Sequence, residues 1–277
     1  MLLMMLLTAT TAWGTINDIL PIESISLQDA ADNSALIAAA NGNILDVTLQ
    51  GRTLYKDGAW NTLCLPFNVD LTAEGCPLAG ADIRRLSATI EHEGATTGFD
   101  PDGGVLTLNF TPKTGDGAVT DIEAGVPYII MWDSGDNITD PVFSGVIVSN
   151  ASTTQSFDGG RVQFIGTYSP ETLTGGDSSN LYLGSGNKLY WPSSDKTINA
   201  FRGYFHVSSS AAVRAFVLNF GDQETTGIVD IEHGTLNMEH SADAGWYDLS
   251  GRKLSGKPTK PGLYINNGRK ILFSDKR

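Results

Sequence analysis

Alternation of apolar and polar residues dominates the chain from residue 44 onward. In the first such run, Leu45, Val47 and Leu49 alternate with polar residues, which predicts a strand with one apolar, buried face and one polar, solvent-facing face. Similar short runs recur, separated by Gly, Asp, Asn and Ser turns. We expect strands over residues 60–67, 105–110, 127–132, 142–148, 162–168, 181–183, 189–191, 201–207 and 213–220. This spacing predicts an all-β fold, with a β-sandwich or jelly-roll-like main domain over residues 44–220.

Two segments depart from simple alternation. Residues 127–132 (PYIIMW) are apolar throughout, which predicts a central strand covered on both faces. Residues 29–40 (DAADNSALIAAA) favour a short helix that ends at Asn41-Gly42, inside a lead-in over residues 15–43. No helical pattern recurs between the later strands, which argues against a parallel α/β fold.

The C-terminal part differs in charge from the rest. Residues 250–277 hold eight basic residues against the single acid Asp275, a net charge of +7, whereas the remaining chain carries −20. The polar segment 221–227 (GDQETTG) precedes short strand patterns, and Asn266-Asn267-Gly268 predicts a hairpin turn. We therefore expect a linker over 221–227 and a separate C-terminal β-module over 228–277. The acidic part of the chain that precedes residue 250 should repel nucleic acid.

The N-terminus has the pattern of a secretory signal. The apolar run Met1–Leu7 precedes small residues and Ala12-Trp13-Gly14, which predicts a signal peptide over residues 1–14 with cleavage after Gly14. A buried N-terminal strand or helix is the alternative. The run is too short to cross a bilayer, and no later segment predicts a transmembrane helix. Cys64 and Cys76, the two cysteines, form either one disulfide or two buried thiols, since spacing does not decide between them.

Candidate chemistry is sparse. The sequence has no G-x-S-x-G, H-E-x-x-H or P-loop motif, and alternation places His92 on the opposite face from Glu91 and Glu93. We expect no enzyme activity; a glycoside hydrolase-like enzyme is a distant alternative, since any of the 31 acids could supply a carboxylate pair. No cofactor is expected. Calcium is a weak candidate, with oxygen ligands clustered in turns at Asp100, Asp102, Asp133 and Asp136.

Aromatic residues supply the best ligand-binding candidates. A sugar ring stacks on an exposed flat side chain beside polar groups, and four rings are candidates for that role: Trp60, Trp132, Tyr190 and Trp191. The alternative is that these rings belong to the core, as most aromatic residues of β-proteins do.

Several motifs resemble known families. Residues 51–58 (GRTLYKDG), 60–67 (WNTLCLPF), 124–129 (AGVPYI) and 199–205 (NAFRGYF) occur in this order in a family of secreted surface proteins from Bacteroidetes, and the body of the chain resembles that family. The resemblance implies an exported β-domain and no known activity. Residues 246–254 (WYDLSGRKL) and 261–272 (PGLYINNGRKIL) look like the C-terminal sorting domain of type IX secretion. That resemblance implies contact with a secretion or anchoring machinery; a small accessory β-domain without a targeting role is the alternative.

These observations favour a protein that is secreted or held at the outer cell surface. We expect a non-catalytic structural or adhesive module whose partners are glycans or other surface proteins. The alternative is a carbohydrate-binding module for polysaccharide capture. Exposure of the candidate tryptophans separates the two roles, because stacking on a sugar needs an accessible ring.

Overall fold

The computed structural model describes residues 23–89, 96–208, 213, 215–219, 226–230, 246–247, 254, 258, 262–266 and 269–273. The chain is all-β, as predicted, and it divides into two compact units, Met1–Glu232 and His233–Arg277. The expected signal peptide lies outside the described residues. The division falls after Glu232, whereas the charge pattern placed a linker at 221–227.

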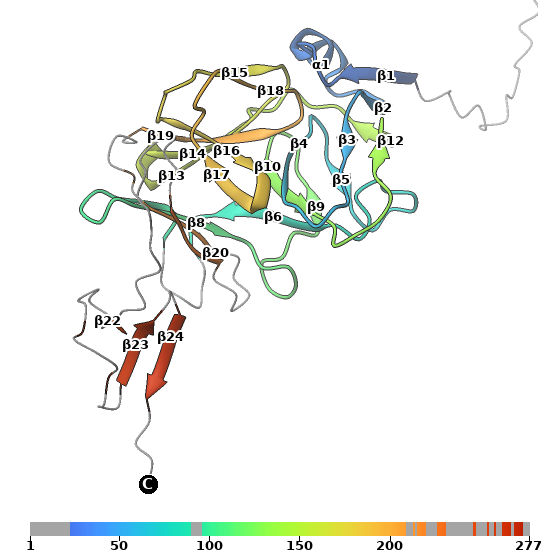
Figure 1. Cartoon of the computed structure of the whole chain (residues 1–277). Helices are drawn as coiled ribbons and strands as arrows, with labels where there is room; N and C mark the ends of the chain where they lie inside the picture. Colours follow the sequence, from blue (N-terminus) through green and yellow to red (C-terminus); the bar gives the residue numbers. More distant parts are fainter. Residues whose placement is uncertain are drawn as a thin grey trace, which may run out of the picture. The chain divides into compact units, whose positions relative to one another are not determined.

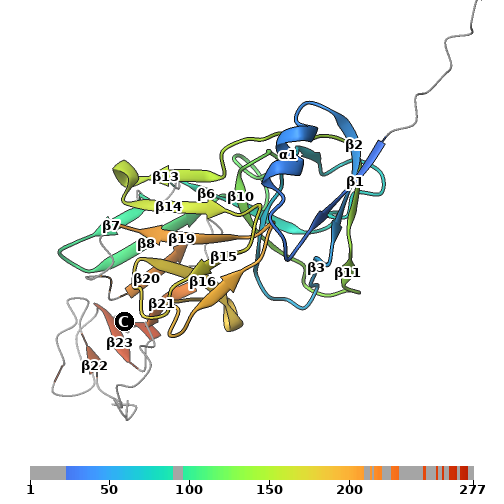
Figure 2. The same cartoon turned by 90° about the horizontal axis from the view of Figure 1, so that it is seen from above.

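A first hydrophobic core lies under a three-stranded sheet of order β1-β2-β12. Figure 2 shows helix α1 beside strands β1 and β2 at one end of this unit. Two short ladders, β3 with β11 and β5 with β9, contribute further residues to this core. The bounds are β1 Glu23–Gln28, α1 Ser34–Ala40, β2 Ile44–Gln50, β3 Thr53–Leu54, β5 Val69–Asp70, β9 Asp121–Ile122, β11 Ile138–Thr139 and β12 Val142–Ile147.

Strands β1 and β2 run parallel, with helix α1 between them in the chain. The sequence predicted neither β1, which falls in the lead-in, nor a helix joining parallel strands. The helix begins at Ser34 rather than Asp29 because the Asn33 side chain holds the preceding residues in a turn. Its Oδ1 accepts from the backbone N–H of Gln28 (2.7 Å), and its Nδ2 donates to the carbonyls of Ala31 (2.8 Å) and Tyr168 (2.9 Å). Ile37 and Ala40 then point into the core.

A second core lies between two larger sheets of the same unit, a β-sandwich-like arrangement (Figure 1). One sheet has the order β21-β20-β8-β6-β10-β4, with β7 also paired to β8, and the other has the order β13-β14-β19-β16-β17. Phe205 connects the layers, since its ring stacks on Phe164 at 4.3 Å and meets Phe110 edge-on at 6.4 Å.

The first sheet consists of β4 Asn61–Cys64, β6 Asp82–Ser87, β7 Gly98–Asp100, β8 Val105–Phe110, β10 Pro127–Met131, β20 Ala215–Asn219 and β21 Thr226–Asp230. The second consists of β13 Thr154–Phe157, β14 Val162–Gly166, β16 Asn180–Gly184, β17 Lys188–Tyr190 and β19 Gly203–Val207. A separate ladder joins β15 Glu171–Leu173 to β18 Lys196–Ile198, and single 3-10 turns occupy Asp158–Gly160 and Ser185–Asn187.

Strand β10 belongs to both cores. Ile129 packs in the second core, whereas its neighbours Tyr128 and Ile130 pack in the first, and all three are buried. The apolar run predicted a strand covered on both faces, and the structure confirms it. Alternation of side chains along the strand is what lets one strand serve two cores.

Strand β21 pairs with β20, so residues that the sequence assigned to the linker and to the tail module extend the seven-stranded sheet of the first unit. The second unit has a three-stranded sheet of order β22-β23-β24, with bounds Trp246–Tyr247, Gly262–Asn266 and Arg269–Phe273. Asn266 pairs with Arg269 in the hairpin that the sequence predicts there.

Candidate functional site

A polar cavity of about 510 Å³ opens in the first unit, where β4, the hairpin of β16 and β17, strand β18 and the turn before β19 come together. Fourteen described residues line it, and they are amides, hydroxyls, cations, glycines and a few apolar groups. The side chains that matter most for chemistry are Arg52, Trp60, Tyr182, Lys196, Asn199 and Arg202. We call this cavity the polar pocket.

A carboxylate holds the inner wall of the polar pocket. Asp29 follows β1 and is 7% exposed. Its Oδ2 accepts from Asn199 Nδ2 (2.8 Å) and Arg202 Nη2 (3.3 Å), and its Oδ1 accepts from Arg202 Nη1. Arg202 Nη1 also donates to the carbonyl of Ala200 (2.9 Å). These hydrogen bonds hold the side chains of Asn199 and Arg202 in place in the pocket lining.

Arg202 follows a turn at Phe201 that leads into β19. Phe201 has a φ of 60°, its N–H donates to the Thr167 carbonyl (2.7 Å), and its carbonyl accepts from the N–H of Cys64 (3.2 Å). The strand expected over residues 201–207 would place Phe201 on the same face as Phe205 and Val207. Instead the strand begins at Gly203, and the Phe201 ring packs in the first core while Phe205 packs in the second.

Arg52 is a buried cation in the pocket wall. It is 2% exposed, and its Nη2 donates to the carbonyl of Thr62 (3.0 Å), whereas its Nε has no hydrogen-bond partner among the described residues. Burial and, to a smaller extent, the nearby charge of Arg202 lower the pKa of Arg52 to about 9, although the charge of Asp29 opposes both effects. The two guanidinium groups therefore share one carboxylate, which does not fully compensate their charge.

Tyr182 is the second aromatic residue of the lining, and Tyr190 packs on it from outside the lining. The half-buried rings of Tyr182 and Tyr190 stack with centroids 5.8 Å apart, and Tyr190 donates from its hydroxyl to the Ser185 carbonyl (3.0 Å). The Lys196 ammonium lies 5.4 Å from the centre of the Tyr182 ring. Gly184 lets the two rings approach, because a Cβ there would lie 2.8 Å from the ring of Tyr190 and 3.3 Å from that of Tyr182.

The structure places the four candidate rings in different surroundings, and none is among the exposed residues. Trp60 is half-buried and lines the polar pocket, and Tyr190 lies next to it through Tyr182. Trp191 packs on Phe216 in the second core, with ring centroids 5.9 Å apart. Trp132 is buried in the first core, where its Nε1 donates to the carbonyl of Ala79 (3.1 Å). Of the four candidate rings, Trp60 alone lines the polar pocket, and Tyr190 contacts its lining through Tyr182.

Sequence reasoning missed Tyr182 and the polar residues of the pocket. Arg52 and Arg202 stand inside the motifs GRTLYKDG and NAFRGYF, and each is a basic residue in a strongly acidic body. Basic residues at these two positions of an otherwise acidic sequence were the feature from which a positively charged site could have been predicted.

The four aspartates that the sequence suggested as calcium ligands lie at the surface. Asp100 and Asp102 share one exposed turn, in which Asp100 Oδ1 accepts from the N–H of Asp102 (3.0 Å). Asp133 and Asp136 are also exposed. Across the described part of the chain, no group of three or more His, Cys, Asp or Glu side chains lies close enough to hold a metal ion. Residues 91–93 (EHE) lie outside the described residues.

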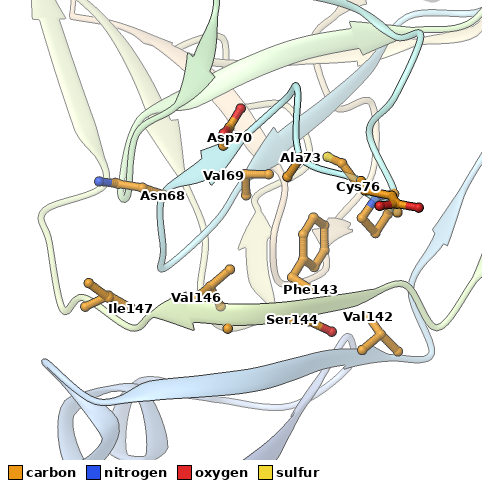
Figure 3. Close-up of a pocket in the computed structure, with 14 residues that line it drawn as sticks. Asn68, Val69, Asp70, Ala73, Cys76, Val142, Phe143, Ser144, Val146 and Ile147 are labelled. Atoms are coloured by element: carbon orange, nitrogen blue, oxygen red, sulfur yellow. The ribbon is translucent and has the colours of Figure 1, made fainter. Parts of the chain in front are cut away.

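A second cavity of about 490 Å³ runs between strand β12 and the loop that follows β5 (Figure 3). Among the described strands β12 pairs with β2 alone, and its Val142 and Ile147 side chains are 48% and 57% exposed. Phe143 and Val146 contribute apolar lining. Two exposed acids line the cavity across from β12, Asp70 at the end of β5 and Glu74 in the loop that follows it. This groove is acidic and apolar, in contrast to the polar pocket.

The two cysteines are free thiols in the structure. Cys64 is fully buried against Gly166, and Cys76 is half-buried in the groove of Figure 3. Of the two alternatives left open by the sequence, the structure therefore has unpaired thiols, of which Cys64 alone is fully buried. Burial also raises the pKa of the Cys64 thiol, which suppresses its reactive thiolate form.

We therefore expect one thiol to react with Ellman's reagent in the native protein, namely Cys76, and both to react in guanidinium chloride. A Cys76→Ser variant should show no fast-reacting thiol. A count of zero in denaturant without reductant would contradict the free-thiol assignment and reveal a disulfide.

No known family model matches the sequence, and no curated protein or solved structure shows significant similarity to it. Among the described residues no helix is long and apolar enough to cross a membrane.

Proposed function

We propose that this chain is an exported, non-catalytic surface protein whose main domain binds saccharides in the polar pocket. The observation that carries the proposal is the combination of Tyr182 and Trp60 with amide, hydroxyl and ammonium groups in a single cavity on strands. Sugar recognition uses a flat apolar surface for one face of the ring and directed polar groups for the hydroxyls. Strands and their hydrogen-bonded turn hold these groups in fixed positions.

The lining of the pocket supports a binding role rather than hydrolysis. None of its described residues is an aspartate, glutamate or histidine. Glycoside hydrolysis requires two carboxyl groups on either side of the scissile bond, and general acid–base catalysis by other routes most often uses histidine. A saccharide bound here would meet cations, amides and hydroxyls.

Export is proposed from the sequence. The apolar N-terminus and the basic tail support transport to the cell exterior and contact with a secretion or anchoring machinery.

A structural or adhesive role through protein contacts is the second candidate. The groove along β12 favours it, because an unpaired strand edge beside exposed apolar side chains can accept an extended segment of another protein. A main domain that binds no saccharide would leave this role as the better explanation.

A glycan array with the mature protein tests the proposal, followed by titration of the bound glycans against a Tyr182→Ala variant. We expect this variant to bind at least about fivefold more weakly, because an aromatic contact contributes about 1 kcal/mol beyond burial. Tyr55→Ala is the matched control, since Tyr55 is 46% exposed and does not line the pocket. Thermal melting should show that both variants fold. Absence of any bound glycan, or equal affinity of Tyr182→Ala and the wild type, would contradict the proposal.

A further inference from the structure

We propose that the polar pocket selects saccharides that carry an anionic substituent, a carboxylate or a sulfate ester. This inference rests on the proposed saccharide binding and adds the chemical class of the ligand. It is carried by the charges of the residues that line the cavity and by how these charges are compensated.

The charge of the pocket is opposite to that of the chain. The fourteen described lining residues include Arg52, Lys196 and Arg202 and no acid, although the chain holds 31 acidic and 18 basic residues. A random sample of polar residues from this chain would be rich in carboxylates. The lining is therefore a local positive site inside an acidic domain.

The protein compensates only part of this charge. Asp29 lies behind the lining and interacts with Arg202 and Asn199. Lys196 forms no ion pair among the described residues; its ammonium lies over the Tyr182 ring instead. The Nε of Arg52 has no hydrogen-bond partner among the described residues. Burial and the charge of Arg202 destabilise the charged form of Arg52 by more than Asp29 stabilises it. Among the described residues, one carboxylate therefore acts on two of the three cations, and none pairs with Lys196.

Accessibility assigns different tasks to the three cations. Lys196 is exposed and the Arg202 side chain is 25% exposed, so a ligand can reach both. Arg52 is nearly inaccessible and acts through its field, which is weakly screened in a buried setting. An anionic group that contacts Lys196 and Arg202 would lie in the field of all three. A sugar ring attached to it is then close to Tyr182, over which Lys196 lies.

The surroundings favour a saccharide over a dense polyanion. Outside the basic tail the chain has a net charge of −20, which repels nucleic acid at long range. In an acidic saccharide the charged groups are spaced along the sugar polymer. One carboxylate or sulfate can therefore enter the pocket while the neutral hydroxyls contact the surrounding amides.

The test compares matched ligands and matched lysines. The ligands are oligomers of galacturonic acid, glucuronic acid and sulfated galactose, each with its methyl-esterified or desulfated counterpart, titrated calorimetrically at low and high salt. The variants are Lys196→Gln, which removes a charge from the pocket lining, and Lys188→Gln, which removes an exposed charge from the neighbouring strand β17, outside the lining.

We expect at least one charged oligomer to bind more tightly than its neutral counterpart, with the preference reduced in high salt. Lys196→Gln should weaken that binding roughly fivefold, as the loss of a partly exposed charge contact does, and leave the neutral oligomer unchanged. Lys188→Gln should bind as the wild type does. The uronate and sulfate arms identify which anion fits.

Equal binding of charged and neutral oligomers, or equal effects of the two lysine variants, would overturn this inference and leave saccharide binding intact. Failure of every oligomer and of the glycan array would overturn saccharide binding itself. The two failures are therefore distinguishable.

Discussion

A Gly166→Ala variant is expected to lose about 3 kcal/mol of its free energy of unfolding, near the upper end of the usual cost of overpacking a core. A Cβ at Gly166 would overlap Cys64 Sγ, lie 2.7 Å from Cys64 Cβ and lie 3.3 Å from Thr153 Cβ. Cys64 cannot move aside, because it is fully buried in strand β4 of the neighbouring sheet. Urea denaturation followed by circular dichroism measures the loss.

Cys64→Ala in the same background provides the control. It removes the Sγ atom that the new methyl group would overlap, so the double variant should be more stable than the sum of the two single changes predicts. Such coupling is expected only for side chains in direct contact. If the two effects simply add, or if Gly166→Ala is as stable as the wild type, the packing of β14 against β4 described above is wrong.

An Asp29→Ala variant is expected to lose about 3–5 kcal/mol, the usual cost of removing one partner of a buried ion pair. The substitution leaves Arg202 without its carboxylate and removes the main group that stabilises the charge of Arg52. It also leaves the Asn199 amide without its acceptor. Thermal and urea unfolding report the effect.

Asp133→Ala serves as the reference, because this exposed aspartate should change stability by no more than about 0.5 kcal/mol. Asp29→Asn keeps the size of the side chain and one hydrogen-bond acceptor, so its loss should be smaller than that of Asp29→Ala. Equal stability of Asp29→Ala and Asp133→Ala would show that the arginines do not depend on this carboxylate.

Much of the fold follows from local pattern. The alternation at Leu45, Val47 and Leu49 predicts β2, and the unbroken run at 127–132 predicts a strand between two cores, as found. Strand β1 was missed because Glu23–Gln28 pairs with β2 across a helix, and its stability comes from that pairing rather than from its own weak pattern. The helix begins late because the Asn33 amide bonds with the chain before it.

The pocket was harder to predict than the strands. Trp60 and Tyr190 were sensible choices by residue type, but Asp29 and Arg202 lie 173 residues apart in the chain and meet only in the folded structure. Local pattern carries no information about such a distance. The positive φ of Phe201 is equally invisible, since a bulky aromatic residue rarely adopts it and the surrounding hydrogen bonds impose it.

The two-faced strand β10 has a consequence for how the domain unfolds. Ile129 belongs to one core and Tyr128 and Ile130 to the other, so neither core can open without disturbing the strand that completes its neighbour. The two halves should then melt as one cooperative unit, with the amides of β10 among the slowest to exchange with deuterium. The polar pocket takes residues from elements of both halves, which ties its geometry to global unfolding rather than to local fluctuations.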